Sequence, residues 1–164
     1  MVITYQGGRS FKISQGELSL VINPQSKTSA DITIVTDEKK EISDKSGFVI
    51  SGPGEYEIKE VFVKGFAGQV YLITFEGIKT CFLGSETSEE LDDVDILLTP
   101  VALYKNAVSL ESAVMIPMDF DKTSLSQFLK EAGETKVEPI DKLVVKKKDL
   151  EGKEGEVVVL QELT

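Results

Sequence analysis

Hydrophobic and polar residues alternate through much of the first hundred positions, and this pattern predicts a series of short β-strands. Segment 31–35 is almost continuously apolar, which is typical of a strand inside a sheet. Glu76 and Gly77 predict a tight hairpin between two of the segments. The predicted strands are 3–5, 10–13, 18–22, 31–35, 48–50, 56–58, 62–65, 70–75, 79–83 and 95–98.

The last sixty residues predict two helices and three more strands. Apolar residues recur at helical spacing over 124–132, and Gly133 follows as a helix C-cap. A shorter helix is predicted over 109–113, with Ser109 at its start. Segment 114–118 returns to a strand, and segments 143–146 and 157–160 predict a hairpin.

In the first half of the chain, Gly52-Pro53-Gly54 predicts a further hairpin turn, between segments 48–50 and 56–58.

Composition predicts one soluble globular domain spanning residues 1–164, with 41% hydrophobic and 28% charged residues. The chain carries 28 acidic and 18 basic residues, and its formal net charge of −10 disfavours binding to nucleic acids or anionic membranes. No apolar run is long enough to cross a bilayer, and the first residues lack the features of a signal peptide. We therefore expect a cytoplasmic protein.

Histidine is absent from the chain, and Cys81 is its single cysteine. Histidine supplies the neutral nitrogen ligand of most zinc sites and the usual general base near neutral pH. An intrachain disulfide is impossible, and the apolar neighbours of Cys81 predict a buried, unreactive thiol.

Several short motifs carry a resemblance that extends over nearly the whole chain. Segment 5–11 (Tyr-Gln-Gly-Gly-Arg-Ser-Phe) is similar to a strand followed by Gly-His-Ser and an aromatic residue. Segments 31–36, 50–56, 80–84, 94–101 and 114–118 follow in the matching order. Together they resemble the metallo-β-lactamase superfamily, closest to its small lactonase-like metal-dependent hydrolases related to ascorbate-6-phosphate lactonase. The resemblance implies an α/β fold, an αββα sandwich of two mixed β-sheets, here with reduced outer helices.

The family's metal-binding positions carry other residues in this chain. After Thr36 the family has His-x-His-x-Asp-His, whereas this chain has Asp-Glu-Lys-Lys-Glu-Ile. By the same resemblance, Ser85 replaces the bridging aspartate and Asp119 replaces the final histidine. Lys39 would place an ammonium group where an imidazole bound the metal, which would repel a dication strongly. We therefore expect no metal and no other cofactor.

Three functional hypotheses remain, and one of them is a purely structural or assembly subunit. The first is a non-catalytic protein that binds a small ligand or a protein partner at the degenerate cleft of Asp37, Lys39, Glu41, Ser85 and Asp119; the reduced helices also leave one face open for a homodimer or partner contact. The second is a hydrolase with a metal-free site or a rebuilt carboxylate site. In the carboxylate site, Asp37, Glu41 and Asp119, with Glu38 and Glu86 further out, would hold Mg²⁺, Mn²⁺ or Ca²⁺.

One serine and three aromatic residues near the predicted cleft are further candidates for a functional role. Ser85 lacks a Gly-x-Ser-x-Gly elbow and a histidine base, so we do not expect it to be a nucleophile. Phe66, Tyr104 and Phe120 are candidate aromatic residues at the cleft mouth.

Overall fold

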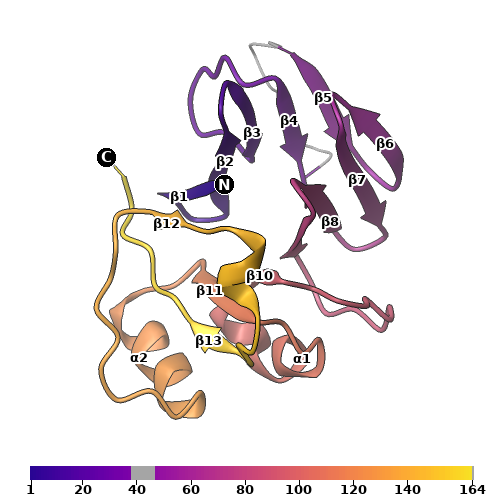
Figure 1. Ribbon diagram of the computed structural model, residues 1–164. Helices are drawn as coiled ribbons and strands as arrows, with labels where there is room; N and C mark the ends of the chain where they lie inside the picture. Colours follow the sequence, from indigo (N-terminus) through magenta and orange to yellow (C-terminus); the bar gives the residue numbers. More distant parts are fainter. Residues whose placement is uncertain (38–46, 164) are drawn as a thin grey trace.

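The computed structural model describes residues 1–37 and 47–163, and its strands form two stacked β-sheets (Figure 1). Within these ranges the first sheet has six strands in the order β12-β1-β2-β3-β4-β5. They are β1 (Val2–Gly7), β2 (Ser10–Gln15), β3 (Leu18–Ile22), β4 (Ile32–Val35), β5 (Phe48–Ser51) and β12 (Leu143–Val144).

The second sheet has, within the same ranges, seven strands in the order β13-β11-β10-β9-β8-β7-β6. They are β6 (Gly54–Ile58), β7 (Val61–Phe66), β8 (Val70–Phe75), β9 (Ile78–Leu83), β10 (Ile96–Pro100), β11 (Val114–Met118) and β13 (Glu156–Val157). Both sheets contain parallel and antiparallel pairs, since β3-β4-β5 and β9-β10-β11-β13 are parallel whereas their other neighbours are antiparallel.

The main hydrophobic core fills the space between the two sheets. Ile13 and Ile34 face it from the first sheet, and Ile73, Phe82 and Leu98 face it from the second; all five are fully buried. The period-two pattern of the sequence places these side chains on one face of each sheet. The predicted sandwich of two mixed β-sheets is therefore confirmed.

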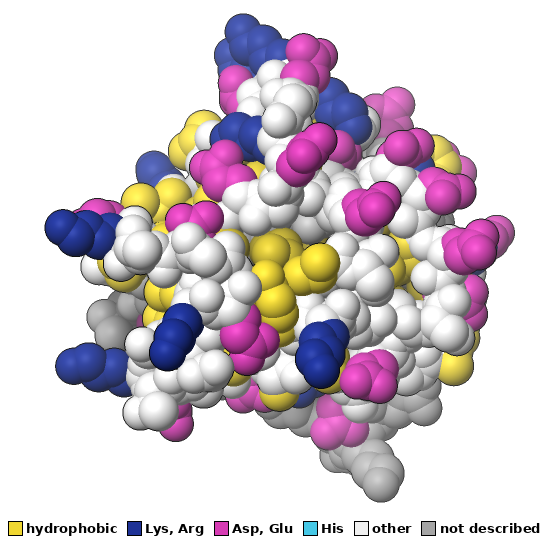
Figure 2. Space-filling view, turned by 90° about the horizontal axis from the view of Figure 1, so that it is seen from below, with side chains coloured by type: hydrophobic (Ala, Val, Ile, Leu, Met, Phe, Trp, Pro, Cys, Tyr) yellow, Lys and Arg dark blue, Asp and Glu magenta, His cyan; other side chains and the backbone are white. Residues whose placement is uncertain are grey.

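Within the described residues, two short α-helices cover the outer face of the second sheet. α1 (Tyr104–Ser109) follows the 3₁₀ turn η1 (Val101–Leu103), and α2 is Lys122–Glu131. Ala107 of α1 and Phe128 of α2 pack in a second apolar cluster with the outward-facing side chains of β9, β10 and β11. Figure 2 views this end of the molecule and shows apolar side chains in its middle, surrounded by charged ones. A further 3₁₀ turn, η2 (Lys147–Leu150), lies in the C-terminal region.

The main predicted helix is confirmed, but it begins two residues earlier than the pattern indicated. Asp121 is its N-cap, and its carboxylate accepts a bond from the Ser124 backbone N–H at 2.7 Å, while the Ser124 hydroxyl accepts from the Asp121 N–H at 2.9 Å. The predicted cap Gly133 adopts a φ of 74° just after the helix. The capping box lies before the first apolar residue, which is why hydrophobic spacing alone missed the start.

The prediction of a helix over 109–113 is wrong. Helical turns begin directly after Pro100, and Ser109 is the last residue of α1. Ala107 is the fully buried residue of α1, so packing against the second sheet fixes the helix one turn earlier. Glu111 then leaves the helical region with a φ of 50°.

Two predicted hairpins are also wrong. Residues 52–53 carry the chain from β5 in the first sheet to β6 in the second, and the Gly52 N–H donates to Tyr71 Oη at 2.9 Å. The two C-terminal segments separate, because β12 pairs with β1 and β13 pairs with β11. Each segment satisfies its hydrogen bonds at an existing sheet edge. The hairpin at Glu76-Gly77 is confirmed, with φ values of 53° and 74°.

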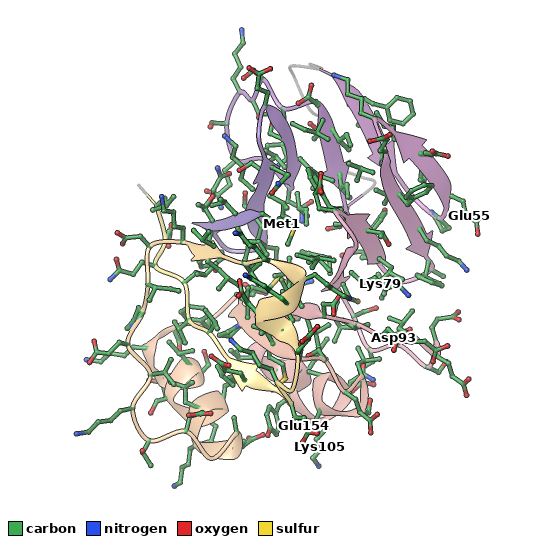
Figure 3. All side chains as sticks on the ribbon, viewed as in Figure 1. Met1, Glu55, Lys79, Asp93, Lys105 and Glu154 are labelled. Atoms are coloured by element: carbon green, nitrogen blue, oxygen red, sulfur yellow. The ribbon has the colours of Figure 1, made fainter. Side chains whose placement is uncertain are left out.

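The N-terminal residue is part of the folded structure. Met1 has only 8% of its surface exposed, and its ammonium group donates to the Val145 carbonyl at 3.1 Å. Figure 3 shows Met1 within the fold, whereas Glu55 on the edge strand β6 points outward. Among the described residues, the longest helix is far too short and polar to span a lipid bilayer.

Candidate functional site

The candidate site lies where several strands and turns end at one rim of the sandwich. It contains the β1–β2 turn, the ends of β3, β4, β9 and β11, and the β7–β8 turn. Hydrogen bonds between these segments bring them together, and the Arg9 side chain in the β1–β2 turn makes two of them, to segments that follow β9 and β11.

Arg9 connects the two sheets. Its Nε donates to Asp119 Oδ2 at 3.1 Å, and its Nη1 donates to the Gly84 carbonyl at 2.7 Å. Asp119 follows β11 and Gly84 follows β9, so both partners belong to the second sheet while Arg9 belongs to the first. About a third of the Arg9 side chain is exposed (34%) and about half of Asp119 (53%). The guanidinium group is permanently charged, which makes both bonds charge-assisted.

The backbone of Arg9 continues the network toward β3 and β4. Asn23 Nδ2 donates to the Arg9 carbonyl at 3.1 Å and to Thr36 Oγ1 at 2.9 Å. The Thr36 N–H returns a bond to Asn23 Oδ1 at 2.9 Å. Asn23 is in the left-handed region with a φ of 50°, which asparagine tolerates better than most residues. The ends of β3 and β4 are therefore fixed relative to Arg9.

The β7–β8 turn is fixed on the other side. The Gly84 N–H donates to the Gln69 carbonyl at 3.1 Å, and Ser85 Oγ donates to the Gly68 carbonyl at 2.5 Å. A side chain at Gly84 would overlap the Gln69 carbonyl oxygen, so this close approach requires glycine. The Ser85 hydroxyl thus has a structural partner in this turn.

Shallow cavities lined by the described residues open around Arg9 and Asp119. One of about 330 Å³ is lined by Arg9, Asn23, Thr36, Asp37 and Gln69, with two further polar residues. A neighbouring one of about 430 Å³ shares Thr36, Asp37 and Gln69 and extends to Phe66. The third, of about 440 Å³, lies beyond Asp119 and contains Phe120.

The structure brings together three of the five predicted cleft residues. Asp119 and Ser85 lie beside Arg9 and Gly84, and Asp37 lines the cavities that open next to Arg9. Lys39 and Glu41 lie outside the described residues, as does Glu38.

The remaining candidates divide between two places. Phe66 and Phe120 line cavities at the rim, as predicted. Tyr104 does not, because it lies in α1, stacks edge-on against Phe128 and donates its hydroxyl to the Glu131 carbonyl. Glu86 lines a separate cavity beside Tyr104. Within residues 1–37 and 47–163, no three acidic, cysteine or histidine side chains form a group suited to a metal ion.

Sequence reasoning missed Arg9 as a site residue. A signal was present, because Arg9 is the only arginine of the chain and occupies the histidine position of the Gly-His-Ser motif that segment 5–11 resembles. Its partners, however, are 75 and 110 residues away along the chain. No local pattern could identify them.

Arg9→Ala is expected to lower the free energy of unfolding by about 1–2 kcal/mol, since it removes two charge-assisted bonds at a partly exposed position. Arg9→Lys should recover less than half of this loss, because an ammonium group cannot reproduce the guanidinium geometry. Urea denaturation measures both. Lys153→Ala is the matched control, since its pair with Glu156 is exposed and lies within one segment; equal losses for Arg9→Ala and Lys153→Ala would contradict the bridging role.

Comparison with solved structures identifies the architecture. A proposed Zn-dependent hydrolase of the metallo-β-lactamase superfamily from Thermotoga maritima superimposes with a TM-score of 0.78, at 26% identity and with 98% of each chain covered. The fold is that of the metallo-β-lactamase superfamily.

Two more distant structures share this metallo-β-lactamase fold. A proposed metal-dependent hydrolase from Parabacteroides distasonis gives a TM-score of 0.57 at 16% identity, covering 99% of this chain and 93% of its own. Igni18, a metallo hydrolase from the archaeon Ignicoccus hospitalis, gives 0.56 at 14% identity, covering 88% and 99%. No protein-family model matches the sequence, and no curated protein matches it.

Proposed function

We propose that the protein is a metal-free, non-catalytic member of the metallo-β-lactamase fold that binds a small ligand or a protein partner at the rim around Arg9. The observation that carries the proposal is the position of the Arg9 guanidinium, which bonds to Asp119 and to Gly84. Within this proposal, the motif order supports kinship with the lactonase-like branch of the superfamily.

The donor set around Arg9 does not fit a transition-metal pair. A guanidinium group has no lone pair to offer a metal and remains protonated at physiological pH. The Asp119 carboxylate is already paired with Arg9. The Ser85 hydroxyl already donates a hydrogen bond to the Gly68 carbonyl. Zinc sites need three or four nitrogen, sulfur or carboxylate donors that are free to coordinate. A dication placed beside Arg9 would also experience direct repulsion.

At this rim, hydrogen bonds between protein groups connect the strand ends, as metal coordination would in a metal-binding relative. Arg9 reaches Gly84 and Asp119 with its side chain and Asn23 with its carbonyl. These hydrogen bonds link the strand ends to one another, which supports a rim that needs no metal ion. Two cavities at this preformed rim have volumes of about 330 and 430 Å³, which are within the size range of small-molecule binding sites.

Metal analysis together with hydrolase assays tests the proposal. We expect less than about 0.1 equivalent of bound metal after dialysis against micromolar Zn²⁺, Mn²⁺, Mg²⁺ or Ca²⁺. We also expect no hydrolysis of lactone, phosphodiester or β-lactam substrates above the buffer blank.

A different result would favour the hydrolase hypothesis. Stoichiometric metal, or hydrolysis that a chelator abolishes, would overturn the proposal. Loss of that hydrolysis in Asp37→Ala would then assign a rebuilt carboxylate site. The matched control for that variant is Asp141→Ala, a change at an exposed aspartate in the C-terminal region.

A further inference from the structure

A cavity of about 440 Å³ opens beside Asp119. Its walls come from the end of β1, the segment between β11 and α2, and the C-terminal segment. The lining residues are Tyr5, Gly8, Asp119, Phe120, Leu125, Pro139, Val159, Leu160, Gln161 and Glu162.

Backbone hydrogen bonds hold these walls in place. The Asp119 N–H donates to the Gly8 carbonyl at 3.0 Å, and the Leu163 N–H donates to the Tyr5 carbonyl at 2.9 Å. The Gln161 N–H donates to the Ile140 carbonyl at 2.9 Å. Because all three bonds join segments distant in sequence, the cavity is preformed and a ligand would not have to order it.

An apolar, partly aromatic surface forms one side of the cavity. The ring of Phe120 stacks on Tyr5, with the ring centroids 6.0 Å apart and an interplanar angle of 25°. Leu125 and Leu160 continue this surface. It suits the apolar body of a ligand, and the Phe120 ring can also attract a cation.

Two carboxylates line the cavity, and Glu162 supplies its net negative charge because Arg9 neutralises Asp119. Glu162 has its side chain against Gly7, where an added methyl group would overlap Glu162 Oε1. Asp119 supplies the second carboxylate, and its own φ of 56° is in the left-handed region. Burial raises the pKa of the Tyr5 hydroxyl above its ordinary value of 10.0, and the Glu162 and Asp119 carboxylates raise this pKa further.

The charges around the cavity favour a cation over an anion. None of its lining residues within the described chain is a lysine or an arginine. Arg9 pairs with Asp119, whereas Glu162 forms no ion pair with a lysine or arginine among residues 1–37 and 47–163. The net charge of −10 adds a long-range attraction for positive ligands.

We propose that this cavity binds a small organic ammonium ion, with its apolar body against Phe120 and its ammonium group near Glu162. The inference rests on the proposed binding function and specifies the chemical class of the ligand. Carboxylates with an aromatic neighbour are suited to a positively charged amine, which gains from both the charge and the ring.

Calorimetric titration with three probes of similar size tests the ligand class. Phenethylammonium carries a positive charge, 2-phenylethanol is neutral and 3-phenylpropionate is negative. We expect phenethylammonium to bind at least about tenfold more tightly than either of the others. Its affinity should fall several-fold as salt is raised, because the carboxylates are partly exposed. Equal binding of the three probes, or no binding of phenethylammonium at millimolar concentration, would overturn the inference.

Single substitutions test the location. Glu162→Gln is expected to weaken phenethylammonium binding about three- to tenfold by removing one charge at constant shape. Phe120→Ala should also weaken it. Glu17→Gln is the matched control, an exposed glutamate in the β2–β3 turn, and should leave the affinity within about twofold. Equal effects of Glu162→Gln and Glu17→Gln would overturn the assignment.

Metal analysis separates this inference from the proposed function. A metal-free protein that fails to bind phenethylammonium would overturn the ammonium site alone. A protein that binds stoichiometric metal would overturn the proposed function whatever the amine result.

Discussion

Alanine in place of Gly84 is expected to lower the free energy of unfolding by about 2–4 kcal/mol. The added methyl group would overlap the Gln69 carbonyl oxygen, which is the acceptor of the Gly84 N–H at 3.1 Å. Relief requires the β7–β8 turn or the end of β9 to move, and either movement weakens the bond from Arg9 to the Gly84 carbonyl. The substitution therefore disturbs the rim through steric overlap, with no change of charge. Urea denaturation followed by circular dichroism measures the loss.

Gly77→Ala provides the matched control for this prediction. Gly77 has a φ of 74° and nothing within 4 Å of an added methyl group, so only the backbone conformation is disfavoured. We expect a loss of about 1 kcal/mol there. If Gly84→Ala were no more damaging than Gly77→Ala, the tight contact between β9 and the β7–β8 turn would be refuted.

Cys81 is expected to react with a thiol reagent at least about a thousandfold more slowly in the native protein than in the unfolded chain. Burial raises the pKa of the Cys81 thiol from 9.0 to about 12, so at pH 8 the thiolate is about a thousandfold rarer. The residue is also fully buried on the outer side of β9, beneath the helices. The sequence-based prediction of a buried thiol is confirmed, and the low reactivity follows from it. Labelling with a chromogenic disulfide, with and without urea, measures both rates.

The rate of Cys81 labelling should depend on the stability of the fold and on pH, and both dependences serve as controls. Native labelling should follow the opening of the second sheet, so Gly84→Ala should accelerate it while Gly77→Ala does so less. In unfolded protein the rate should rise with pH up to the ordinary thiol pKa and then level off. Native labelling within tenfold of the unfolded rate at pH 8 would show that Cys81 is accessible.

Much of the sandwich could be predicted from local patterns in the sequence. Alternation of apolar residues in 70–75 and 79–83 identified β8 and β9, and Glu76-Gly77 identified the turn between them, because these signals depend on neighbouring residues. The continuous apolar segment at β4 indicated an interior strand, which the pairing with β3 and β5 confirms. The absence of histidine likewise restricts the metal chemistry that this chain can support.

The partners of strand edges could not be predicted from these patterns. Gly52-Pro53-Gly54 has the composition of a hairpin turn, yet it carries the chain from one sheet to the other. The C-terminal segments satisfy strand propensity equally well as a hairpin or as separate edge strands. Packing of the complete sandwich decides between these arrangements, because it alone determines which edges are open.

The amino-acid sequence by itself settled which segments become strands and which side of each strand is apolar, since both follow from the chemistry of adjacent residues. Only the tertiary structure selected Arg9 among the 18 basic residues, by placing its guanidinium between the ends of β9 and β11. A charged side chain acquires such a role from acceptors that are close in space, and chain folding is what brings those acceptors within reach.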